Sequence, residues 1–227
     1  MFRIELSYCV GMKNRIIFSF FVLGFVLICL LFSYPAILEK AGRFLAPEGI
    51  GKADVVILEG TKFIEEDALI IGLRLLSYVK ANRLVVVHTK SQKESVSSMS
   101  VNYAFLLTQK LEYLGLKKHQ FQVLEVTSNH PITLTEAQIV LFNLSKEGVH
   151  SAILLCEGFH TRRSYWTYKQ VGLPLGIKIF PYSYFIKYRK QTWWQQSRGI
   201  YHFISEFSKL FYYIFQGYIP LKSLTET

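Results

Sequence analysis

The chain has 227 residues, of which 51% are hydrophobic, 15% aromatic and 19% charged, and its formal net charge is +10. The low charge density and high aromatic content exclude an intrinsically disordered chain and a coiled coil. Three cysteines without CxxC or Cys/His spacing exclude a disulfide framework and argue against a structural metal site. Since this length allows one or two domains, we expect a globular domain plus a segment that raises the hydrophobicity.

Residues 16–34 form such a segment, because they include no charged side chain. As a helix they would extend about 28 Å, close to the ~30 Å hydrocarbon core of a bilayer. Residues 1–15 carry Arg3, Lys13 and Arg15 against the single acidic Glu5, which predicts a cytoplasmic N-terminus. The sequence therefore predicts a single-pass anchor in a bacterial inner membrane, with a linker at 35–52 and a periplasmic domain. A cleaved signal peptide is the alternative, although its apolar region is usually shorter.

Between residues 53 and 184, short apolar runs alternate with helical patterns. The runs show little polar alternation, as in strands buried on both faces, and enough residues separate them for helical crossovers. This alternation predicts an α/β domain with a Rossmann-like, doubly wound, mostly parallel sheet of about five strands. The expected strands are Asp54–Glu59, Arg83–His88, Phe121–Val126, Ala152–Cys156 and Ile177–Tyr182.

Residues 185–227 form an aromatic tail with a helical apolar stripe from Ile200 to Ile214. The polar side of this stripe carries Arg198, His202, Glu206 and Lys209. A terminal helix packed on the domain is one interpretation. The other places the tail's aromatic side chains at a bilayer interface, with inner-membrane lipid as a partner.

Ligands of open parallel sheets bind beyond the carboxyl ends of the strands, which selects a polar set of candidate residues here. A helix that begins near residue 161 would direct backbone N–H groups and two arginines to the same place, which suits a phosphate. We therefore predict an anionic or phosphate-bearing small molecule as the ligand. The candidate proton-transfer residues are His160, Glu136 and Glu59; the candidate ligand-binding residues are Gly60, His88, Lys90, Thr133, Thr135, Arg162 and Arg163.

Each candidate also has a structural alternative. His160 could simply form a hydrogen bond at a strand end, and Glu136 could be a carboxylate at a helix N-terminus. Neither GxGxxG nor a Walker A motif is present, so no motif indicates a nicotinamide cofactor or a nucleoside triphosphate, and the cofactor stays unknown. Nucleic acid is not expected as a partner, since the basic excess would serve a domain beside an anionic bilayer.

At these positions the sequence resembles the YdcF-like (SanA/ElyC) family of bacterial envelope proteins. The segment 133–137 (TLTEA) is similar to the family's central Thr-x-x-(Glu)-Ala element, and His160 with Arg163 is similar to its closing His-x-x-Arg signature. Two segments differ: Glu59-Gly60 replaces a run of glycines, and residues 88–90 (HTK) replace Ser-Gly-Gly. The resemblance, which spans residues 52–184, implies a Rossmann-like fold, membrane attachment and a role in envelope or peptidoglycan metabolism.

The leading functional hypothesis is an envelope-biogenesis protein that binds an anionic small molecule or a lipid-linked phosphate intermediate, with hydrolase or transferase chemistry left open. One alternative is a non-enzymatic scaffold that recruits partners through the aromatic tail. Another is an enzyme that binds a nucleotide or S-adenosylmethionine, which rests on fold analogy alone.

Overall fold

The computed structural model describes residues 18–20, 22–25, 33–61, 64–90, 102–127 and 129–224. The chain forms two compact units, Met1–Ala41 and Gly42–Thr227. In the N-terminal part, residues 18–20, 22–25 and 33–45 are helical. The remaining regular structure lies in the second unit, which contains all the candidate site residues.

The predicted membrane anchor at 16–34 lies partly outside the described residues. Where the chain is described, no helix is both long enough and apolar enough to cross a bilayer. The helical stretch 33–45 carries Glu39, Lys40 and Arg43, and the longest C-terminal helix, at 197–215, carries three charged side chains. The prediction of a single-pass inner-membrane protein with a periplasmic domain is therefore wrong.

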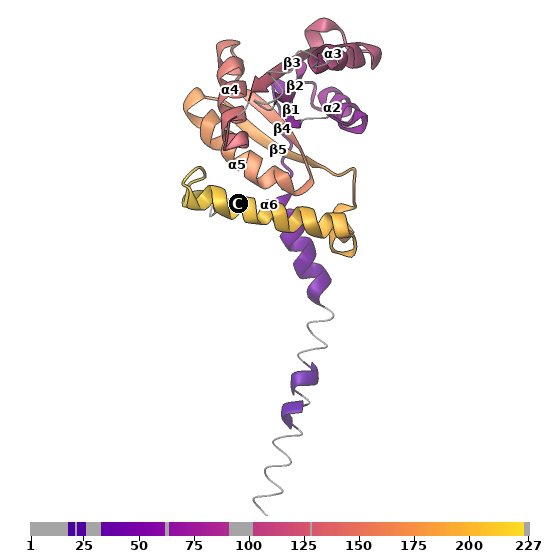
Figure 1. The fold of residues 1–227 in the computed structure, drawn as a ribbon, viewed down its shortest axis with the longest axis vertical. Coiled ribbons are helices and arrows are strands. Elements are labelled where there is room, and N and C mark those ends of the chain that lie inside the picture. Colours follow the sequence, from indigo (N-terminus) through magenta and orange to yellow (C-terminus); the bar gives the residue numbers. More distant parts are fainter. Residues whose placement is uncertain are drawn as a thin grey trace, which may run out of the picture. The chain divides into compact units, whose positions relative to one another are not determined.

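A five-stranded, all-parallel sheet forms the centre of the second unit, with the strand order β3-β2-β1-β4-β5 (Figure 1). The predicted Rossmann-like α/β class is consistent with this sheet. The strand order reverses between β1 and β4, which is where such sheets bind ligands. The strands are β1 (Val55–Thr61), β2 (Arg83–Lys90), β3 (Phe121–Thr127), β4 (Ser151–Glu157) and β5 (Lys178–Tyr184).

Helices cover both faces of the sheet because alternate strand residues point to opposite sides. Helices α2 (Glu66–Val79) and α3 (Tyr103–Tyr113) pack on the face that includes Val56 and Leu58 of β1. Helices α4 (Ile132–Lys146) and α5 (Thr161–Gly172) pack on the face that includes Val55 and Ile57. The two covered faces explain why the strands read as apolar runs without alternation.

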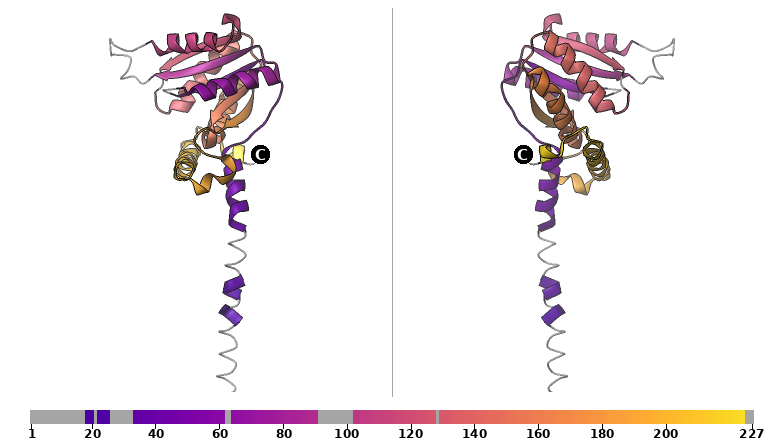
Figure 2. Two further views of the ribbon diagram at one scale, coloured as in Figure 1. Left: turned by 90° about the vertical axis from the view of Figure 1, so that its right-hand side faces the viewer. Right: turned by 90° about the vertical axis from the view of Figure 1, so that its left-hand side faces the viewer.

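The tail forms helix α6 (Ser197–Phe215), which contacts α5 and the short helix that precedes α5 (Figures 1 and 2). An aromatic cluster holds this region together: the Phe159 ring lies 5.3 Å from that of Trp193 and 5.2 Å from that of Phe203. Trp193 is buried, so this part of the tail forms a local core. The short 3-10 helices are η2 (Lys118–Gln120), η3 (Gly158–His160), η4 (Leu173–Leu175), η5 (Lys190–Gln195) and η6 (Leu221–Leu224).

Candidate functional site

A cavity of about 560 Å³ lies beyond the carboxyl ends of β1 and β4, at the reversal of strand order. Six of the ten predicted site residues line it: Glu59, Gly60, Thr133, Glu136, His160 and Arg163. The start of α4 contributes further lining, and α6 and the turn after it contribute a second wall. The residues of this second wall are His202, Glu206, Lys209, Tyr212, Tyr213 and Tyr218.

A tight turn after β4 places His160 in the cavity wall. Gly158 has φ +55°, a conformation that favours glycine, and a Cβ there would lie 2.6 Å from the hydroxyl of Tyr188 and 3.1 Å from the ring of His202. The chain can therefore leave the sheet directly into η3 and α5. As a result, His160 sits at the start of α5, where Arg163 lies one helical turn further on the same side.

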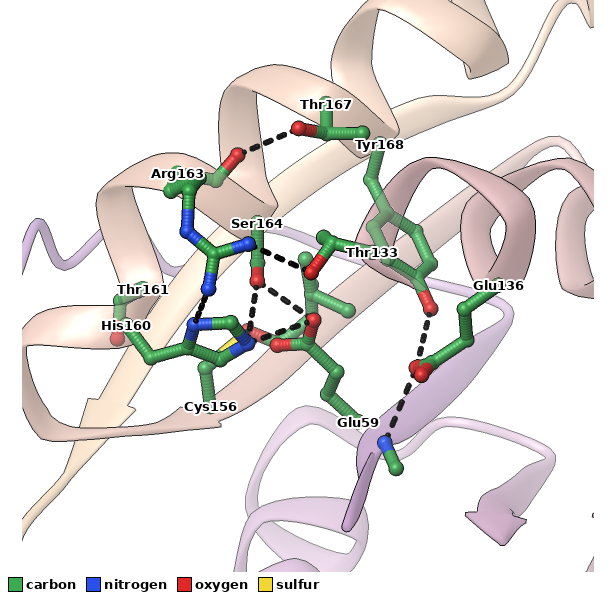
Figure 3. A network of polar contacts seen from close by, with 12 residues as sticks. Glu59, Thr133, Glu136, Cys156, His160, Thr161, Arg163, Ser164, Thr167 and Tyr168 are labelled. Atoms are coloured by element: carbon green, nitrogen blue, oxygen red, sulfur yellow. Dashed lines mark hydrogen bonds and ion pairs between the residues drawn. The ribbon is translucent and has the colours of Figure 1, made fainter. Parts of the chain in front are cut away.

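Carboxylates contact both ring nitrogens of His160. Nε2 lies 3.0 Å from Oε1 of Glu59 and 2.9 Å from the hydroxyl of Ser164, which in turn donates to the same Glu59 oxygen (Figure 3). Nδ1 lies 3.0 Å from Oε2 of Glu206, and Nη2 of Arg163 approaches it to 2.7 Å. Glu59 and Ser164 therefore fix the ring from one side, while Glu206 and Arg163 meet its other nitrogen.

These contacts determine the charge of His160. Burial and the neighbouring charge of Arg163 oppose a charge on the ring, but the carboxylates of Glu59 and Glu206 outweigh them and raise the pKa of His160 to about 9. Burial raises the pKa of Glu59 as well, yet the charge of His160 brings it below its ordinary value. The two carboxylates therefore favour the protonated form of His160 at neutral pH, and in that form Nδ1–H donates to Glu206.

The guanidinium of Arg163 is almost completely paired. Nε and Nη2 donate to Oε2 of Glu206 at 3.1 and 2.9 Å, and Nη1 donates to Thr133 at 2.7 Å. The ring of Tyr213 lies 4.9 Å from the guanidinium carbon. Arg163 thus connects α5 with α4 through Thr133 and with α6 through Glu206.

Glu136 belongs to a second polar cluster in the same cavity. Its carboxylate accepts hydrogen bonds from the backbone N–H of Gly60 at 3.1 Å, from Thr89 at 2.9 Å and from Tyr168 at 3.0 Å. A Cβ at position 60 would lie 2.4 Å from the Thr89 hydroxyl, so a glycine permits this close approach. Burial and the charge of Glu59 raise the pKa of Glu136 to about 7 despite the three donors.

The other four predicted residues do not line the cavity. His88 is buried against the ring of Tyr103, and Lys90 pairs with Glu125 at 2.6 Å. The Thr135 hydroxyl donates to backbone oxygens at the start of α4. Residues at the ends of β2 and α4 therefore serve local structure here.

Arg162 also points away from the cavity. Its guanidinium carbon lies 4.7 Å from the ring of Phe44 and 5.0 Å from that of Trp166, and its Nε donates to the backbone oxygen of Phe44. Adjacent positions at a helix start face different directions, so one of the two predicted arginines is structural.

The tail residues of the cavity are absent from the predicted set, and Glu206 is the most important of them. It is the only acidic residue between Glu157 and Glu226, and it lies on the polar side of the tail's helical stripe. The isolated acidic residue in a basic tail could therefore have indicated a partner for one of the two arginines. Recognising this partner requires knowing that the tail packs beside α5.

Comparison of the chain with known protein families and with curated proteins finds no match. The resemblance to the YdcF-like family stays a prediction, and the function has to be inferred from the geometry of the cavity.

Proposed function

We propose that this chain binds a small phosphate-bearing anion in the cavity beyond the carboxyl ends of β1 and β4, with His160 as the proton donor to the bound ligand. The observation that supports this proposal most is the convergence of His160 and Arg163 on one oxygen position beside the cavity. A guanidinium and an imidazolium aimed at one oxygen are typical of oxyanion recognition.

The backbone adds to the positive potential of this region. The cavity is lined by Pro131, Ile132 and Thr133 at the start of α4, and by His160 at the start of α5. The first N–H groups of a helix have no partner within the helix, and the helix dipole favours an anion there. At the start of α5 the N–H of Thr161 already donates to Gly158, so it is the start of α4 that contributes backbone donors beside the two cationic side chains.

The cavity also holds carboxylates, and these shape the proposal. Glu59 and Glu206 neutralise much of the positive charge of His160 and Arg163, so this is a balanced site and not a simple basic pocket. A balanced site suits proton transfer because charged partners hold the groups in defined protonation states. With a pKa of about 9, His160 carries a proton at neutral pH that it can donate to a ligand oxygen.

The resemblance to the YdcF-like family adds the proposal that the ligand belongs to envelope or peptidoglycan metabolism. A polyprenyl phosphate and a free sugar phosphate would then both be candidate ligands. The cavity would recognise the phosphate group in both, and the two ligands differ only in the lipid or sugar attached to that phosphate.

Calorimetric titration tests the proposal. Phenyl phosphate, a hexose phosphate and a short polyprenyl phosphate would be titrated into the wild-type protein and into Arg163→Gln. We expect wild-type binding and a loss of at least about tenfold in Arg163→Gln, the effect of ~1.4 kcal/mol. Arg162→Gln is the matched control, since Arg162 does not line the cavity. The absence of phosphate binding to the folded wild type would contradict the proposal.

A scaffold function is the second candidate, and one face of α6 supports it. Tyr201, Ile204, Phe211 and Phe215 are 77%, 58%, 54% and 89% exposed on this helix. Large exposed apolar side chains on one helix are typical of interaction surfaces. Deleting α6 would also remove Glu206 from the cavity, so the discriminating variant is Phe211→Ser with Phe215→Ser, which leaves the cavity lining intact.

A further inference from the structure

One oxygen of Glu206 occupies the point where the cationic groups of α5 converge. Oε2 lies 3.0 Å from Nδ1 of His160 and 3.1 and 2.9 Å from Nε and Nη2 of Arg163. The carboxylate is 5% exposed, and it reaches this point from α6. Three nitrogen atoms around a single anionic oxygen reproduce the surroundings that a bound phosphate oxygen requires.

We propose that Glu206 is an internal substitute for the ligand: it occupies the oxyanion subsite of the cavity, and a phosphate oxygen of the ligand displaces it. This inference rests on the proposed phosphate-binding function. It assigns the subsite to Nδ1 of His160 and to the Nε and Nη2 edge of Arg163, and it makes the contact between α6 and α5 autoinhibitory.

The cationic groups keep their positions without Glu206, because other partners hold them. Nη1 of Arg163 donates to Thr133 on α4 at 2.7 Å. Nε2 of His160 is held by Glu59 at 3.0 Å and by Ser164 at 2.9 Å. The polar partners that remain without Glu206 therefore come from β1, α4 and α5, whereas Glu206 and Tyr213, whose ring lies 4.9 Å from the Arg163 guanidinium carbon, come from α6.

Glu206 also has a partner that can accompany it when it leaves. Its other oxygen, Oε1, accepts a hydrogen bond from Lys209 at 2.7 Å, three residues along the same helix. The Lys209 side chain is 52% exposed, so this pair can move toward solvent without leaving the carboxylate unpaired. A displaced Glu206 therefore avoids the penalty of a buried, isolated charge.

Displacement changes the role of His160. Nδ1 lies 3.0 Å from Oε2 of Glu206 and donates to it when the ring is protonated, whereas Nε2 is anchored by Glu59. When a phosphate oxygen replaces Glu206, the same Nδ1–H points at the ligand and Glu59 still orients the ring. Glu59 and His160 would then act as a carboxylate–imidazole pair whose proton faces the substrate.

The opposing hypothesis is that Glu206 is a positioning residue that must stay in place to orient His160 and Arg163. The two hypotheses predict opposite effects of Glu206→Gln on phosphate affinity. Glutamine has nearly the same shape but no charge, so it competes poorly for the donors of His160 and Arg163. Displacement predicts tighter binding, whereas a positioning role predicts weaker binding.

The experiment is a calorimetric titration of phenyl phosphate into the wild type, Glu206→Gln and Glu157→Gln. Glu157 lines the same cavity and pairs with the partly exposed Lys187 at 3.2 Å, so its variant removes an equal charge outside the subsite. We expect Glu206→Gln to bind at least about tenfold more tightly than the wild type, or ~1.4 kcal/mol. The change in phenyl phosphate affinity caused by Glu157→Gln should be a small fraction of the change caused by Glu206→Gln.

Equal effects of the two variants, or weaker binding by Glu206→Gln, would overturn the displacement. If the displacement of Glu206 is overturned but the wild type binds phenyl phosphate and Arg163→Gln does not, the proposed phosphate-binding function still holds. If neither the wild type nor Glu206→Gln binds while both are folded, the proposed function fails as well.

A second measurement needs only the wild-type protein, in case Glu206→Gln unfolds. Amide hydrogen exchange would be followed with and without saturating phenyl phosphate. Displacement predicts faster exchange in α6 around Glu206 and slower exchange at the start of α5. Slower exchange in both helices would show that the ligand tightens their contact, and it would refute the proposal.

Discussion

Arg163 on α5 donates two hydrogen bonds, at 3.1 and 2.9 Å, to one oxygen of Glu206 on α6, and both side chains are less than 10% exposed. Removing Arg163 withdraws two of the hydrogen bonds of the buried Glu206, which keeps His160 and Lys209 as partners. We therefore expect Arg163→Ala to lower the free energy of unfolding by about 2–3 kcal/mol, measured by urea denaturation. The free energy of unfolding of Arg163→Lys should lie between those of the wild type and Arg163→Ala, since lysine keeps the charge but lacks the paired donors of the guanidinium.

Lys187→Ala is the control for this measurement. Lys187 pairs with Glu65 and Glu157 at 3.1 and 3.2 Å, but its side chain is 43% exposed. Exposed pairs contribute less than about 1 kcal/mol. Comparable losses in Arg163→Ala and Lys187→Ala would contradict the importance of the buried pair.

Gly158→Ala tests the turn that places His160. The added Cβ would meet the Tyr188 hydroxyl at 2.6 Å, and φ is +55°. We expect a loss of stability of about 1–3 kcal/mol, together with a change in the NMR environment of the His160 ring. Gly176→Ala is a suitable comparison, because its φ is +70° but nothing lies within 4 Å of the added carbon. An unchanged His160 signal in Gly158→Ala would show that the turn does not control the site.

The sequence predicted the α/β class and the approximate position of every strand, because buried parallel strands read as uninterrupted apolar runs. It also placed Glu59, Glu136 and His160 near one another, because the carboxyl ends of parallel strands share an edge. It failed at the N-terminus, where the uncharged stretch 16–34 predicts a membrane anchor. No described helix is both long enough and apolar enough to cross a bilayer.

The roles of the two adjacent arginines could not be separated from the sequence. Arg162 and Arg163 follow each other at a helix start. Only the three-dimensional structure shows that the Arg162 guanidinium packs against the rings of Phe44 and Trp166 and does not line the cavity. Glu206 was missed for a similar reason, since it lies 43 positions from Arg163 and the pairing depends on how α6 docks. Long-range contacts between a tail and a domain leave little trace in local patterns.

Glu136→Gln should remove a pH dependence of stability. The pKa of Glu136 is raised from 4.5 to about 7 on folding, so the unfolded chain releases this proton first. The wild type should therefore lose up to about 3.5 kcal/mol of stability between pH 4.5 and 7, since one pKa unit equals ~1.4 kcal/mol. Glutamine can keep the contacts to Gly60, Thr89 and Tyr168, and its denaturation midpoint should change less across this window. A wild-type slope retained in the variant would contradict this origin.

His160 should also lose its contribution to stability as pH rises, but in a higher pH window than Glu136. Its folded-state pKa is raised from 6.5 to about 9, so its contribution to stability is complete below pH 6.5 and is lost as pH rises through 9. Urea denaturation from pH 6 to 10 should show a steeper decline for the wild type than for His160→Gln. An NMR titration of the ring should give an apparent pKa well above 6.5. A value near 6.5 would show that Glu59 and Glu206 do not hold the charge.

Arg162→Gln separates a structural arginine from a binding one. The guanidinium of Arg162 lies near the rings of Phe44 and Trp166, and burial lowers its pKa to about 10. Because the charge is partly desolvated over two aromatic rings, we expect the variant to lose about 1–2 kcal/mol of stability in urea denaturation. Its affinity for phenyl phosphate should match that of the wild type, whereas Arg163→Gln should lose affinity. Weaker phosphate binding by Arg162→Gln would contradict this assignment, because it would show that Arg162 contributes to the ligand.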